Sequence, residues 1–150
     1  MQDEIIQIIS GVHRLSSVTG RITDRVLQEH LGFGMTQFKI IWVLYNHREE
    51  GGVRQSDIAM WLNQTEAAIS RQIRPMSRKK LLASTVDPKN RRSHIVRLTE
   101  GGEALAEAGM TILVEAHAPY VNRLTPKQQA DLVAVLNSLF IGACEHIDIA

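Results

Sequence analysis

Residues 54–98 contain two short amphipathic segments followed by two short strand-like segments. The first amphipathic segment, 54–62, is apolar on one side, and Asn63 after it tolerates the left-handed conformation of a tight turn. Thr65 can then cap a second helix by accepting from the N–H groups of its first turn. The inner face of that helix is expected to carry Ile69, Ile73 and Met76. Two short helices joined by a turn of about three or four residues predict a helix-turn-helix motif.

A β-hairpin is expected after the second helix of this motif. Two short strand-like runs, 81–86 and 94–98, flank the sequence DPKNRRS, which consists of turn formers and cations. This pattern predicts a hairpin with a long basic tip. Before the hairpin, Pro75 falls inside the helical pattern and has no N–H to donate, so we expect a kink or an early end of the helix there.

Longer helices are expected on both sides of this region. Apolar residues at steps of three and four predict one amphipathic helix over 4–31, and Thr36 can cap the next helix. A helical pattern returns after Thr99 and ends near Pro119. The last helix is expected to open with a cap, a first-turn proline and a capping-box partner, which are Thr125, Pro126 and Gln128. The sequence therefore predicts a mainly α-helical fold with one small β-hairpin.

The charge of the chain is concentrated in one segment. The whole chain of 150 residues has a formal net charge of +1, whereas residues 65–97 hold nine basic and two acidic residues, a net charge of +7. Such a local excess is typical of a surface that binds nucleic acid, although a charge run can also be a solvated face. A chain of this length fits one compact domain.

Several classes of protein are disfavoured. The first residues are acidic, and no apolar run approaches the roughly 18 residues of a membrane span, so we expect a cytoplasmic protein without membrane contact. The one cysteine, Cys144, cannot form an internal disulfide and is interpreted as a packed thiol. The six histidines are scattered, and no acid, base and nucleophile cluster together. We therefore expect no metal, no cofactor and no enzymatic activity.

The sequence LNQTEAAISRQIRPMSRKKLLASTVDPKNRRSHIVRLTEGG, residues 62–102, resembles the recognition helix, wing and following helix start of MarR-family regulators. Its most specific part is the wing, where the family has Asp, Pro, a basic residue, usually Asp, Arg-Arg, a strand and then Leu-Thr. The resemblance implies a winged helix-turn-helix over 35–101, with dimerisation helices over 1–34 and 102–150. It also implies a homodimer on double-stranded DNA with a palindromic operator.

The sequence departs from the family pattern at three positions, one of which is Pro75 inside the recognition helix. Lys80 stands where the family usually has a glycine after the recognition helix, so this helix has to end without the residue best suited to a left-handed conformation. Asn90 stands where the wing usually has an aspartate, which makes this wing more basic and weakens any ion pair within it.

The candidate DNA-binding residues lie on the recognition helix and the wing. With the apolar side of the helix turned inward, Ala67, Ala68, Arg71 and Arg74 lie on its outer face or flanks. Arg71 is expected to contact a guanine with two hydrogen bonds, and the two alanines allow close approach and could touch a thymine methyl group. The hydroxyl groups of Thr65 and Ser70 suit a phosphate or a base edge.

The wing is expected to enter the minor groove through its cations, which are Lys89, Arg91 and Arg92. By resemblance, Asp87 is an internal partner that orients a wing arginine, since a carboxylate that faced a phosphate would be repelled. Three cations at the end of the recognition helix either contact phosphates or only end the helix: Arg78, Lys79 and Lys80.

The resemblance implies a transcription regulator, expected to be a repressor that a small molecule releases from DNA. Members of the family often bind phenolic or other amphipathic compounds in a crevice between the dimerisation helices and the winged part. The alternative is a winged helix that serves architectural or protein contacts without a specific operator. An enzyme is the third reading, and it would need a clustered acid, base or metal set.

Overall fold

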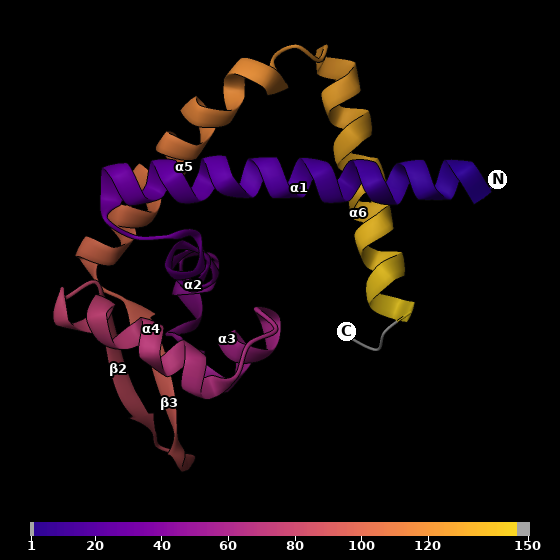
Figure 1. The fold of residues 1–150 in the computed structure, drawn as a ribbon. Coiled ribbons are helices and arrows are strands. Elements are labelled where there is room, and N and C mark those ends of the chain that lie inside the picture. Colours follow the sequence, from indigo (N-terminus) through magenta and orange to yellow (C-terminus); the bar gives the residue numbers. More distant parts are fainter. Residues whose placement is uncertain (1, 147–150) are drawn as a thin grey trace. The chain divides into compact units, whose positions relative to one another are not determined.

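The computed structural model describes residues 2–146, except for the side chains of Arg92 and His146. Figure 1 shows the ribbon of this chain. The elements follow in the order α1 (Gln2–Leu31), α2 (Met35–Asn46), a 3-10 turn (Arg48–Glu50), β1 (Val53–Arg54), α3 (Gln55–Trp61), α4 (Glu66–Arg78), β2 (Leu82–Asp87), β3 (Asn90–Leu98), α5 (Glu100–Val121) and α6 (Pro126–His146). The expected fold class, mainly α-helical with a small β-hairpin, is confirmed. The chain divides into two compact units, one that ends at Ala116 and one that begins at His117.

The core of the first unit lies between α2, α3, α4 and the sheet. Its fully buried side chains include Ile40, Ile41, Ile58, Ile69, Met76 and Val96. The three residues expected on the inner face of α4 are all buried, so this prediction is confirmed. Burial of apolar side chains from three helices and a sheet fixes α4 on the scaffold with its opposite face free.

The sheet has three antiparallel strands in the order β1–β3–β2. Opposite β2, the register runs from Leu82 facing Leu98 to Val86 facing His94, and Val53 of β1 faces Val96. Gly52, which enters β1 with a φ of +119°, packs against β3. A Cβ on this glycine would lie 2.7 Å from Cγ2 of Ile95 and 2.9 Å from the carbonyl oxygen of Val96. Only glycine suits this position.

The tip of the hairpin differs from the long basic loop that the sequence predicts. Strand β2 continues to Asp87 and β3 begins at Asn90, so two residues connect them and Arg91 lies on the strand. The register shifts between Val86, which faces His94, and Asp87, which faces Asn90. Residues 91–93 therefore form an irregular, bulged part of β3. The prediction of a long loop was wrong. Residues that are typical of turns belong to strand β3, where a bulge accommodates them.

The start of α2 corrects a second prediction. The helix begins at Met35 with Gly34 as its N-cap, so Thr36 is not the capping residue. Asp24 of α1 takes that role, because its Oδ1 accepts from the N–H of Met35 at 2.8 Å. Gln37 adds a second bond by accepting from the N–H of Gly34 at 3.1 Å. A carboxylate eleven residues away thus replaces the local hydroxyl.

The junction between α4 and the sheet is tightly built. Proline at position 75 does not end α4, which runs on to Arg78. Lys80 then takes a φ of +59°, so the helix ends in a left-handed residue without glycine. The N–H and hydroxyl of Thr99 lie 3.0 and 3.1 Å from the carbonyl oxygen of Leu81. A Cβ on Gly102 would overlap that same carbonyl oxygen, so the glycine lets α5 start against the end of α4.

Helix α1 buries little of its apolar side. Leu27 is its buried residue among those described. The apolar side chains of its first two-thirds are 43–61% exposed: Ile5, Ile6, Ile8, Ile9, Val12, Leu15 and Val18. The amphipathic helix expected over 4–31 is confirmed, and its apolar face is open in the single chain.

The second unit consists of the end of α5, which passes Pro119 and stops at Val121, and helix α6. The expected cap of α6 is confirmed, since Oε1 of Gln128 accepts from the N–H of Thr125 at 2.9 Å. Many apolar side chains of α6 are also exposed: Leu132, Val133, Val135, Leu136, Leu139, Phe140 and Ile141. Cys144, on the same helix, is a partly exposed thiol. Among the helices of residues 2–146, none combines the length and the apolar character that crossing a membrane demands.

Candidate DNA-binding surface

The turn that joins α3 to α4 has the geometry expected from the sequence. Asn63 has a φ of +49°, which is the left-handed conformation predicted for it. The N–H of Gln64 then donates to the carbonyl oxygen of Ala59 at 2.9 Å. Thr65 caps α4, because its hydroxyl oxygen accepts from the N–H of Ala68 at 3.1 Å. The hydroxyl oxygen is therefore an acceptor within the protein, and Thr65 itself is exposed.

The outer face of α4 presents the side chains that the sequence singles out. Ala67, Arg71 and Arg74 are exposed, and Ala68 and Ser70 are partly buried. Arg71 and Arg74 form no ion pair with any residue that the structure describes. The N-terminal end of α4 has small residues, and two unpaired guanidinium groups follow within the next two turns. Small residues allow close approach to DNA, while unpaired guanidinium groups can contact phosphates or guanine edges.

The wing contributes a second cationic group at the hairpin. Lys89, at the tip, and Arg91, on the bulged part of β3, are both exposed. Arg92 follows on the same strand, but its side chain lies outside the described residues. Residues 91–93 have no partner residue in the described strand register. Their backbone is therefore not fixed by the regular pairing that joins residues 82–86 to residues 94–98.

Asp87 sits beneath the wing as an internal acceptor. It is only 2% exposed, and its Oδ1 accepts from the N–H of Lys89 at 2.8 Å while its Oδ2 accepts from Nε of Arg54 at 3.0 Å. The N–H of Lys89 lowers the pKa of Asp87 below its usual value, and the charge of Arg54 lowers it further, against the opposing effect of burial. Asp87 is thus a buried carboxylate that holds the turn of the wing.

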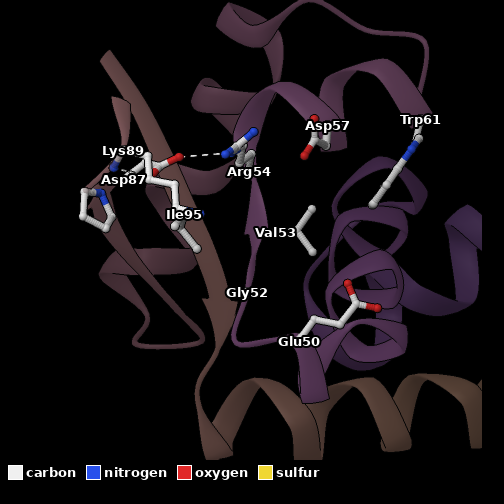
Figure 2. A pocket seen from close by; sticks show the side chains of 10 residues that line it. Glu50, Gly52, Val53, Arg54, Asp57, Trp61, Asp87, Lys89 and Ile95 are labelled. Carbon is white, nitrogen blue, oxygen red and sulfur yellow. Dashed lines mark hydrogen bonds and ion pairs between the residues drawn. The ribbon is translucent and has the colours of Figure 1, made fainter. Parts of the chain in front are cut away.

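Arg54 is a residue of this surface that the sequence reasoning missed. Figure 2 shows it opposite Asp87, in a pocket of about 320 Å³ that Asp57 and Trp61 also line. It belongs to β1 and is the N-cap of α3, and its side chain is half exposed. Among the described residues, Arg54 is the arginine that pairs with Asp87, and it lies 33 residues earlier in the chain. A signal existed in the sequence, because a carboxylate expected to be internal requires a cation.

The cations that follow α4 have structural roles. Nζ of Lys79 lies 4.4 Å from the centre of the Phe33 ring, in the loop between α1 and α2. Lys80 supplies the left-handed end of the helix, and its carbonyl oxygen lies 2.7 Å from the hydroxyl oxygen of Thr99. For these two lysines the helix-ending interpretation has direct structural support. Arg78 is the last residue of α4 and is exposed.

A shallow hollow of about 410 Å³ separates α4 from the hairpin. Its lining includes Arg74 and Arg78 from the helix and Ser84 and His94 from the strands. Ser77 lines it as well, and its hydroxyl oxygen is buried without a hydrogen-bond partner among the described atoms. The hollow lies between the two elements that carry the candidate DNA contacts.

The helix-turn-helix, the hairpin and the core between them form one recognisable domain. A family model described as a winged helix DNA-binding domain matches residues 33–102. The crystal structure of MepR from Staphylococcus aureus in complex with DNA is 28% identical and covers 89% of this chain and 96% of that chain, with a TM-score of 0.73. The chain contains a winged helix DNA-binding domain, and its fold matches that of the MarR-family regulators MepR and MarR.

Other solved structures of the MarR family agree in fold. Another structure of MepR, called a transcription regulator of the multidrug efflux pump MepA, is 26% identical and covers 88% of this chain and 95% of that one, with a TM-score of 0.69. A cysteine-to-serine variant of MarR from E. coli, complexed with operator DNA, has a TM-score of 0.74 at 21% identity and covers 91% of this chain and 96% of that chain. A search among curated proteins finds no match.

Proposed function

We propose that this chain is a transcription regulator of the MarR family that binds a palindromic operator in double-stranded DNA as a homodimer. The observation that carries the proposal is the outer face of α4. Arg71 and Arg74 are exposed there and form no ion pair with the described residues, while the opposite face of the helix is buried in the core. A helix held in this way fits the major groove. The winged-helix relatives solved with DNA support this assignment.

The individual contacts follow from side-chain chemistry. Arg71 donates two hydrogen bonds to a guanine, and Arg74 contacts the same groove or its phosphates. Ala67 and Ala68 permit close approach, and Ser70 suits a base edge or phosphate. Thr65 caps α4 through its hydroxyl oxygen, which accepts from the N–H of Ala68, and its O–H can still donate to a phosphate or base edge. The wing places Lys89, Arg91 and Arg92 in the adjacent minor groove.

The homodimer rests on the apolar faces of the terminal helices. Ile5, Ile8, Val12 and Leu15 of α1 are each more than 40% exposed, and the apolar side chains of α6 are exposed as well. Faces of this size are rarely left in water by a soluble protein. We therefore propose that residues 1–34 and 102–150 form a two-fold interface, and that residues 35–101 form the DNA-binding part. Two-fold symmetry would match the palindrome of the operator.

Regulation is proposed to follow from the spacing of the two recognition helices. A dimer on its operator blocks transcription, and a phenolic or other amphipathic compound that binds between the dimerisation helices and the winged part shifts the dimer to a spacing that no longer fits DNA. The chain then needs no catalytic residue. Because its proposed target is DNA, we place the protein in the cytoplasm.

The test is a binding selection from a randomised duplex pool at about physiological salt, with sequencing of the bound fraction. Wild type is compared with Arg71→Ala and with Lys39→Ala, which removes one exposed cation from α2. We expect wild type and Lys39→Ala to select the same short palindrome, and Arg71→Ala to lose preference at the guanine position, a discrimination worth about 1–3 kcal/mol. Uniform weak binding by all three proteins would overturn the proposal and favour an architectural or protein-binding module.

A further inference from the structure

Arg54 and Gln55 are consecutive residues that reach the two parts of the proposed DNA-binding surface. Arg54 occupies the N-cap position of α3 and donates from Nε to Oδ2 of Asp87 in the wing at 3.0 Å. Gln55 begins α3 and donates from Nε2 to the carbonyl oxygen of Glu66, in the first turn of α4, at 3.3 Å. The start of α3 is therefore linked by side chains both to the wing and to the recognition helix α4.

Asp87 connects Arg54 to the tip of the wing. Its second carboxylate oxygen accepts from the N–H of Lys89, one of the two residues that connect β2 to β3. Asp87 is buried, so its position is fixed by its partners and by the side chains around it. The backbone of Arg54 is fixed in turn, because it faces Ile95 on β3 and follows the buried Val53, which faces Val96.

The charge of Arg54 matters for this contact. Among the side chains that the structure describes, it supplies the ion pair of Asp87. A buried carboxylate without its cation is costly, so removal of Arg54 favours a movement of Asp87 toward water. Such a movement would carry the N–H of Lys89 with it. The wing tip would then lose its fixed position relative to α4.

From this geometry we infer that Arg54 is a positioning residue that sets the place of the wing relative to the recognition helix. The inference rests on the proposed function, in which α4 and the wing enter neighbouring grooves of one operator half-site. Because the two grooves have a fixed separation in B-form DNA, the two reading elements must keep a matching separation. Arg54 thereby determines base preference at the flanking positions that the wing contacts, without touching them.

The experiment repeats the selection from the randomised pool with Arg54→Gln, and with Lys39→Gln as a control for the loss of one positive charge. Lys39 is exposed on α2, outside α4, the wing and the proposed dimer interface. We expect Arg54→Gln to keep the bases chosen by α4 and to lose preference at the flanking positions, with roughly tenfold weaker binding to the wild-type operator. The control should match wild type at every position.

Two results would overturn the inference. A uniform loss of affinity with an unchanged base preference would mean that Arg54 only stabilises the fold. An unchanged base preference together with a salt dependence reduced by about one phosphate contact would mean that Arg54 touches DNA directly. These differ from a failure of the proposed function, in which wild type itself selects no palindrome.

A second variant keeps the test decisive where Arg54→Gln folds poorly. The double variant Arg54→Gln with Asp87→Asn removes the unpaired charge, while the amide oxygen of the new side chain can still accept from Lys89. We expect the double variant to fold and still to lose the flanking preference, because neither neutral side chain restores the ion pair that joins β1 to the wing. A double variant with the wild-type preference would show that the Arg54–Asp87 pair does not position the wing.

Discussion

The hydroxyl oxygen of Thr99 lies 2.7 Å from the carbonyl oxygen of Lys80, across the junction between the end of α4 and the start of α5. The same hydroxyl oxygen accepts from the N–H of Gly102 at 3.1 Å, in the first turn of α5. One side chain thus stabilises the end of the recognition helix and the beginning of the helix that leads out of the winged part. The Leu-Thr-Glu-Gly-Gly sequence of residues 98–102 has a physical explanation in this contact.

Replacement of Thr99 by valine should destabilise the protein. The variant keeps the shape of the side chain but loses the cap of α5 and the bond to Lys80, which together are worth about 1–2 kcal/mol. Urea unfolding followed by circular dichroism measures the change. Thr99→Ser, which retains the hydroxyl, should stay close to wild type, and equal stability of the valine variant would show that the hydroxyl is not a significant cap.

Lys80→Gly should stabilise the protein. The residue has a φ of +59° and its side chain is exposed, so glycine relieves about 1 kcal/mol of backbone strain and removes no buried contact. Thermal unfolding measures the gain. Lys80→Ala is the matched control, because it removes the same charge and keeps the Cβ; a similar gain in both variants would assign the effect to charge and not to the backbone.

Gly109→Ala should destabilise the first unit. Its Cβ would overlap the ring of Phe38, a buried side chain of α2, and overpacking of this kind costs about 1–3 kcal/mol. Gly11→Ala in α1 is the control, since its Cβ meets open space and alanine favours a helix by about 0.5–1 kcal/mol over glycine. The two alanines should shift the urea midpoint in opposite directions, and a shared direction would contradict the packing of α5 on α2.

The stability of the wing should depend on pH through Asp87. Because the pKa of Asp87 is lower in the folded state than in the unfolded state, the contribution is complete above the unfolded pKa of about 4 and decreases as the pH falls through the folded value. Asp87→Asn should reduce this acid dependence. Hydrogen exchange of the Lys89 amide at a series of pH values measures it locally, and an exchange pattern that Asp87→Asn leaves unchanged would contradict the assignment.

Features set by neighbouring residues could be predicted from the sequence. The cap at Thr65, the left-handed turn at Asn63 and the cap at Thr125 each depend on residues within three positions, and the structure confirms all three. The buried face of α4 also followed from helical spacing alone. Local chemistry therefore identified the helix-turn-helix before any tertiary contact was known.

Features set by distant residues could not be predicted in this way. Asp24 caps α2 from eleven residues away and so displaces the local candidate Thr36. Arg54 reaches Asp87 from 33 residues away, so periodicity gives no sign of the pair. The bulge in β3 depends on the register between two strands. The turn-forming residues of the wing predict a loop instead, so the sequence did not indicate this register.

The exposed apolar faces of α1 and α6 have a consequence for stability. The stability of each protomer depends on the concentration of the others. Under the proposed homodimer, mass action makes the folded state more stable as the total concentration rises, so the melting temperature should increase with concentration. A regulator made in few copies per cell would then lose both its partner and part of its stability on dilution. Cells that reduce its synthesis would remove it from DNA more steeply than in proportion to copy number.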